Sequence, residues 1–186
     1  MTQLRYVQPG YVVIHPNRDR AVCVLTKLVV ALILLASAAL VLAITLGGWS
    51  KLQGMEPVSF IWAAVYVVIA FYIVTRWARG LLPIAAALGI LLLVMAVIAA
   101  FGLDGTSWSA RARAGFAAPH SLFGGQGFGT DLLGTLTAIL IPVQLTLIVA
   151  AMIGFAQGWN VELEVPANAA RERGSRALAR GPRPAG

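Results

Sequence analysis

Four long stretches of this sequence contain no charged residue and no histidine, and they restrict the possible folds more than any other feature. They cover residues 28–46, 58–75, 81–103 and 132–156. A helix rises about 1.5 Å per residue, so about 20 residues cross the hydrocarbon core of a bilayer. Backbone polar groups find no water in that core, so each stretch is predicted to be a helix. The stretches also lack the polar–apolar alternation of a membrane β-strand, which excludes a β-barrel.

The composition agrees with a membrane protein. Of the 186 residues, 59% are hydrophobic without counting glycine, whereas soluble domains usually reach roughly 45–50% even with glycine included. Cys23 is the only cysteine, so a disulfide within the chain is excluded. We therefore predict an all-α integral membrane protein with four transmembrane helices.

The positions of Lys and Arg predict the orientation of these helices. Residues 1–27, 76–80 and 157–186 hold eleven of the fourteen, whereas residues 47–57 and 104–131 hold three. By the positive-inside rule both termini are cytoplasmic. The excess of Arg over Lys is typical of GC-rich bacterial genomes, so we place the chain in a bacterial plasma membrane as a multi-pass protein. The Lys and Arg side chains that give the net charge of +7 are then expected to contact anionic lipid headgroups, and no nucleic-acid partner is predicted.

Three parts follow from this pattern: a cytoplasmic N-terminal segment (1–27), a four-helix membrane domain (28–156) and a cytoplasmic basic tail (157–186). From Ala167 the tail is rich in Ala, Arg, Gly and Pro and has almost no large apolar residue, so it is predicted to be disordered. In the N-terminal segment, Pro9-Gly10 separates two short aromatic and β-branched stretches, which favours a hairpin over Arg5–His15. A lone hairpin is only marginally stable in water.

A glycine-rich segment, Gly124–Gly129, precedes the fourth stretch. It does not match the G-x-G-x-x-G dinucleotide pattern, and no Lys follows it as in a phosphate-binding P-loop. We interpret it as the lead-in to the fourth helix, which Thr130 or Asp131 would cap.

Upstream of the glycines, Trp108, Ala112 and Phe116 recur at four-residue spacing. The spacing is consistent with a short amphipathic helix on the outer leaflet, and equally with an irregular loop.

Catalytic chemistry finds little support in the sequence. A proton or ion pathway normally needs an ionisable residue at depth, and a membrane haem needs axial ligands such as His, but the four stretches contain no charged residue and no His. We predict no catalytic residue, no metal ligand and no cofactor. An enzyme acting on a lipid at the outer face would depend on Asp104, His120 and Asp131, and it is the least favoured hypothesis.

The fourth stretch carries the clearest contact pattern. Thr137, Gln144, Ala151 and Gly158 are spaced by seven residues and Gly154 lies near the same stripe, which drifts only about 20° per step. Small residues let helices approach closely, and Gln144 can form a hydrogen bond across the contact. The stripe is predicted to pack against a helix of this chain or of a partner.

Two functional hypotheses follow. The first is a non-catalytic structural or accessory subunit of a larger bacterial membrane complex, with other membrane protein subunits or further copies of the chain as partners. The alternative is an oligomeric transporter or channel component for a neutral or lipid-like solute. Pro142 close to Gln144 motivates the alternative, because interrupted helices can line cavities.

Overall fold

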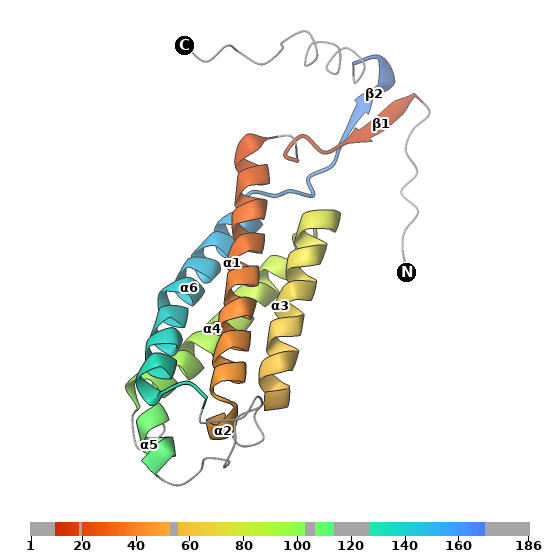
Figure 1. Cartoon of the computed structure of the whole chain (residues 1–186). Helices are drawn as coiled ribbons and strands as arrows, with labels where there is room; N and C mark the ends of the chain where they lie inside the picture. Colours follow the sequence, from red (N-terminus) through yellow and green to blue (C-terminus); the bar gives the residue numbers. More distant parts are fainter. Residues whose placement is uncertain (1–9, 19, 53–55, 103–106, 114–126, 170–186) are drawn as a thin grey trace, which may run out of the picture.

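A computed structural model describes residues 10–18, 20–52, 56–102, 107–113 and 127–169. Over these residues the fold is an up-and-down bundle of four long helices (Figure 1), namely α1 (Ala21–Gly47), α3 (Glu56–Arg76), α4 (Leu81–Phe101) and α6 (Thr130–Ala156). All four are long and apolar enough to cross a membrane. The predicted helical class and the number of candidate spans in the described part of the chain are therefore confirmed.

The two ends of the bundle carry different small elements (Figure 1). One end holds the short helices α2 (Trp49–Leu52) and α5 (Trp108–Arg113). The other end holds two strands, β1 (Tyr11–Ile14) and β2 (Leu163–Pro166). The segments that precede α1 and follow α6 thus lie at the same end of the bundle.

The helices do not stop where the apolar stretches stop. Helix α1 begins at Ala21, seven residues before the first stretch, and so includes Lys27. Helix α4 ends at Phe101, because Gly102 takes a left-handed conformation (φ 59°) and a side chain there would overlap Ser107. A left-handed glycine after the last helical residue is a common way to end a helix.

The four helices pack in the order α3–α1–α6–α4. Helices α1 and α6 form the centre, α3 packs mainly on α1, α4 packs mainly on α6, and α3 and α4 have few contacts with each other. Small buried residues allow these approaches: a Cβ added at Gly89 of α4 would lie 3.2 Å from the Ile148 side chain of α6. The α3–α4 side of the bundle is consequently the least closely packed.

The strands differ from the hairpin that the sequence suggested. Strand β1 pairs in antiparallel register with β2, with Val12 opposite Val165, and Ala167 N donates to Gly10 O at 2.8 Å. Residues 5–9 of the expected hairpin lie outside the described residues. The helices α1 and α6 bring both terminal segments to one end, which makes a pairing over more than 150 residues available. The described structure includes the tail up to residue 169, and residues 170–186 lie outside the described part.

Candidate functional site: a pocket between α3 and α4

The predicted contact stripe of α6 lies inside the bundle of this chain. Thr137, Gln144, Ala151 and Gly154 are all buried against neighbouring helices. The Tyr66 hydroxyl donates to Gln144 Oε1 at 3.0 Å, and Gln144 Nε2 donates to Ser37 Oγ at 3.0 Å. These two bonds join α3, α6 and α1 and give both ends of the Gln144 amide a partner. These four residues of the stripe therefore contact helices of this chain.

The fifth residue of the stripe has a different position. Helix α6 ends at Ala156, and Gly158 follows it with a left-handed conformation (φ 62°). Its carbonyl accepts a hydrogen bond from Asn17 Nδ2 at 3.0 Å. Gly158 thus lies beyond the helix on which the seven-residue spacing placed it.

Of the three residues considered for catalysis, one lies in the described part of the chain. Asp131 lies in the first turn of α6, and the helix is capped by Gly129 with no side-chain bond, so neither Thr130 nor Asp131 is the cap that the sequence suggested. Asp104 and His120 lie outside the described residues. Within the described ranges, no group of three or more His, Cys, Asp or Glu side chains forms a candidate metal site.

The end of the glycine-rich segment docks on the bundle. Phe128 N donates to Gly47 O at 2.8 Å, and the Phe128 ring packs so closely on Gly47 that a side chain at Gly47 would overlap it. Lys51 Nζ donates to Phe128 O at 3.0 Å. The described part of this segment thus packs against the end of α1, while residues 124–126 are outside the described range.

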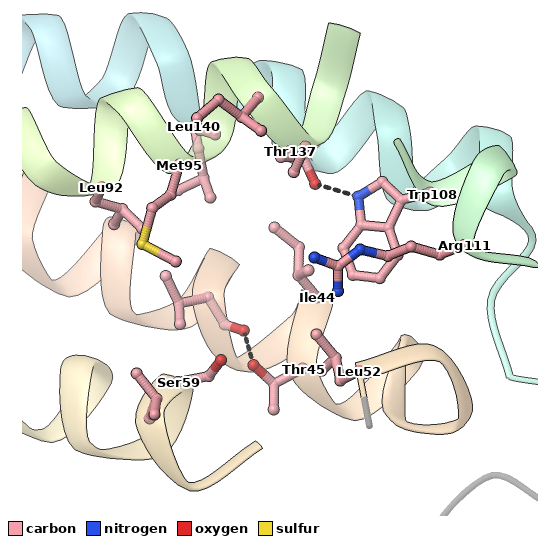
Figure 2. Close-up of a pocket in the computed structure, with 15 residues that line it drawn as sticks. Ile44, Thr45, Leu52, Ser59, Leu92, Met95, Trp108, Arg111, Thr137 and Leu140 are labelled. Atoms are coloured by element: carbon pink, nitrogen blue, oxygen red, sulfur yellow. Dashed lines mark hydrogen bonds between the residues drawn. The ribbon is translucent and has the colours of Figure 1, made fainter. Parts of the chain in front are cut away.

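A pocket of about 220 Å³ lies at the end of the bundle that carries α5 (Figure 2). Side chains from all six described helices line it, and all but a few of them are apolar. The lining residues are Val41, Ile44, Thr45, Leu52, Val58, Ser59, Leu92, Met95, Ala96, Ile98, Ala99, Trp108, Arg111, Thr137 and Leu140.

Helix α5 closes one side of the pocket, and its own sequence explains how it is held. Ser107 caps it, because Ala110 N donates to Ser107 Oγ at 3.2 Å. Trp108 is buried and its Nε1 donates to Thr137 Oγ1 at 3.0 Å. Residues three apart lie on one face of a helix, so Arg111 lines the same pocket as Trp108, as Figure 2 shows.

The pocket exists because α3 and α4 have few contacts. Leu92, Met95 and Ala96 of α4 line one side, and Val58 and Ser59 of α3 line another. Two hydroxyl groups of the lining already donate hydrogen bonds to carbonyl groups of their own helices: Thr45 Oγ1 donates to Val41 O at 2.7 Å and Thr137 Oγ1 donates to Leu133 O at 2.7 Å. The pocket can accordingly hold an apolar group beside a single cationic side chain.

Sequence reasoning did not identify this pocket. The expected stripe of Trp108, Ala112 and Phe116 shares only Trp108 with the lining; Ala112 is exposed, and Phe116 lies outside the described residues. The usable signal was the pair Trp108 and Arg111 at three-residue spacing, next to Ser107 as a helix cap.

Comparisons with models of protein families, with curated proteins and with solved structures found no match to this chain.

Proposed function

We propose that this protein is a non-catalytic integral membrane protein that binds the apolar part of a lipid-like molecule in the pocket between α3 and α4. The observation that carries the proposal is the pocket itself, about 220 Å³ in volume and lined almost entirely by apolar side chains. Apolar cavities of about 150 Å³ take up benzene-sized ligands, so this one has room for a segment of an acyl chain. The proposal belongs to the lipid-like branch of the alternative that the sequence left open.

The position of the pocket supports access from the bilayer. The lining residues of α4 and α3 belong to the two outer helices of the α3–α1–α6–α4 arrangement, which have few contacts with each other. A lipid chain moving in the membrane can thus approach between two helices without crossing water. A water-soluble ligand would instead have to cross apolar side chains to occupy the same space.

The orientation completes the proposal. With both termini in the cytoplasm of a bacterium, the end that carries α2 and α5 lies at the outer leaflet of the plasma membrane. Reporter fusions after Arg79 and Gly186 should then read cytoplasmic, and fusions at Gly54 and Gly125 should read external. A cytoplasmic reading at Gly125 would place the pocket in the inner leaflet.

Native mass spectrometry of the protein extracted in mild detergent tests the pocket directly. The wild type should retain lipid, and the double variant Ala96→Leu, Ala99→Leu should lose most of it because the added side chains fill the pocket. Val94→Leu is the matched control, since Val94 lies on the same helix but is 51% exposed on the outer surface. Equal lipid retention by the double variant and the control would contradict the proposal.

The accessory-subunit role remains a prediction from the sequence. It is tested by identifying proteins that co-purify in fixed proportion with the full chain. A stoichiometric complex, together with no lipid in the pocket, would favour that role over lipid binding.

A further inference from the structure

We propose that the pocket selects an anionic phospholipid, whose phosphate lies beside Arg111 while one acyl chain lies between α3 and α4. This inference rests on the proposed function and adds the chemical class of the ligand. Its basis is the charge of the lining: among the fifteen lining residues in the described part of the chain, Arg111 is the only ionisable side chain and none is acidic.

The position of Arg111 along the bundle matches the level of a headgroup. Arg111 lies on α5 at the end of the bundle, while Leu92 of α4 and Leu140 of α6 line the deep part of the pocket. Leu92 lies nine residues before the end of α4, and Leu140 lies ten residues after the start of α6. At about 1.5 Å per residue the pocket extends about 14–15 Å from the end of these helices toward the bilayer centre. A phosphate at Arg111 therefore places the attached acyl chain along the apolar lining.

The fixed position of α5 makes Arg111 suited to recognition. The bond from Trp108 Nε1 to Thr137 Oγ1 anchors the helix to α6, with both side chains buried. An arginine carries a permanent charge and a planar set of donors that match phosphate oxygens. Lys51, another cation at this end, is not a lining residue and donates to Phe128 O.

The matched control lies on the same helix. Arg113 is exposed and is not a lining residue. Residues two apart point to different sides of a helix, so Arg113 carries the same charge at nearly the same height without facing the pocket. Comparing Arg111→Gln with Arg113→Gln therefore separates recognition in the pocket from general attraction between the protein and anionic lipids.

The experiment reconstitutes the full chain in vesicles that contain equal amounts of phosphatidylglycerol and phosphatidylcholine with matched acyl chains. Native mass spectrometry after gentle extraction then gives the ratio of the two lipids that remain bound. The wild type should favour phosphatidylglycerol by about three- to tenfold. Arg111→Gln should bring the ratio close to one, whereas Arg113→Gln and Arg111→Lys should keep most of the preference. High salt should lower the wild-type ratio, because exposed charge interactions are screened.

The outcomes separate the two proposals. If the wild type retains no lipid, or if filling the pocket changes nothing, the proposed function fails. If lipid is retained but both headgroups are held equally, or if Arg111→Gln and Arg113→Gln give the same ratio as the wild type, only the choice of an anionic ligand fails. Because the readout is a ratio within one sample, a lower yield of folded variant does not imitate lost selectivity. If Arg111→Gln does not fold, the Arg111→Lys ratio and the salt dependence of the wild type decide the question.

Discussion

The two ends of the helix bundle are built in opposite ways. At the end that carries the strands, aromatic rings pack between the helices and hydrogen bonds link the helices to the segments that follow them. At the end that carries α5, a pocket of about 220 Å³ lies between α3 and α4. The same four helices form both ends, so the difference comes from the residues at the helix ends and in the segments that follow or precede them.

We call the end that carries the strands the closed end and the end that carries α5 the open end. The closed end is stabilised by contacts between segments that are distant in sequence. Trp159 is fully buried and packs edge to face on Trp77, with ring centroids 5.7 Å apart. Lys27 Nζ lies 3.8 Å from the centroid of the Trp77 ring. Trp77 has a positive φ of 51°, a conformation that is uncommon for a residue other than glycine and that persists where packing holds it.

A second set of contacts at this end consists of hydrogen bonds. Gln157 Nε2 donates to Thr26 Oγ1 at 2.8 Å, and Gln157 Oε1 accepts from Trp159 Nε1 at 2.9 Å. Arg79 Nε donates to Phe155 O at 2.8 Å, and its guanidinium lies 4.4 Å from the centroid of the Phe155 ring. These bonds join α1, the segment between α3 and α4, and the end of α6. The contacts at this end therefore hold the helices together, whereas the packing at the other end leaves a pocket.

Removal of the largest buried ring at the closed end should have the largest effect. Trp159→Ala is expected to lower the free energy of unfolding by about 3–5 kcal/mol, the usual cost of truncating a buried Trp. Denaturant titration in mixed micelles measures it. Phe101→Ala at the open end, where the ring is 70% exposed, should change stability by no more than about 0.5 kcal/mol. Equal losses in the two variants would contradict the idea of a closed and an open end.

Added volume should distinguish the two halves of a single helix. Ala85 of α4 is fully buried, whereas Ala96 of the same helix lines the pocket. Ala85→Leu is expected to cost about 1–3 kcal/mol because the close-packed half has no space for a larger side chain. Ala96→Leu should cost clearly less, since its side chain can enter the pocket. The comparison uses the same unfolding assay, and a larger cost at Ala96 would mean that the pocket is not open to new atoms.

The polar contact between the two ends should give the smallest effect. Gln144→Leu removes the bonds to Tyr66 and Ser37 and is expected to cost about 0.6–2 kcal/mol, the range for hydrogen bonds between membrane helices. Thr146→Val is the control on the same helix, because Thr146 is exposed and bonds only to Pro142 O in its own helix. A Gln144→Leu protein as stable as the control would show that the contact carries no net stability.

Much of the architecture could be predicted from the sequence, because an apolar helix satisfies the hydrogen bonds of its backbone locally. An uninterrupted apolar stretch must satisfy its own backbone, so the number and approximate position of the four long helices follow from the apolar stretches, whereas their exact ends do not: α1 begins seven residues before the first stretch. The stripe of Thr137, Gln144 and Ala151 was also found from spacing, since the period of a helix fixes which residues share a face. The direction of that face toward this chain's own helices required the folded structure.

The elements outside the helices could not be predicted in the same way. Strand β1 carries a β-branched pattern, but its partner Leu163–Pro166 lies in the tail, directly before the part whose composition suggested little order. The pairing depends on α1 and α6 placing both segments at one end, which no local pattern records. Trp159, three residues beyond the last helix, is buried for the same reason.

What the sequence by itself determined is a chain with four long apolar helices and with most of its Lys and Arg in residues 1–27, 76–80 and 157–186. The helices follow from the need of the backbone to satisfy its own polar groups. What the tertiary structure decided is where the bundle is filled and where it is hollow. Trp108 and Arg111 line the same pocket because α5 packs against Thr137 of α6 and because α3 and α4 have few contacts with each other. A pocket is the space that packing leaves between distant segments, so its physical cause lies in the arrangement of all the helices rather than in any one of them.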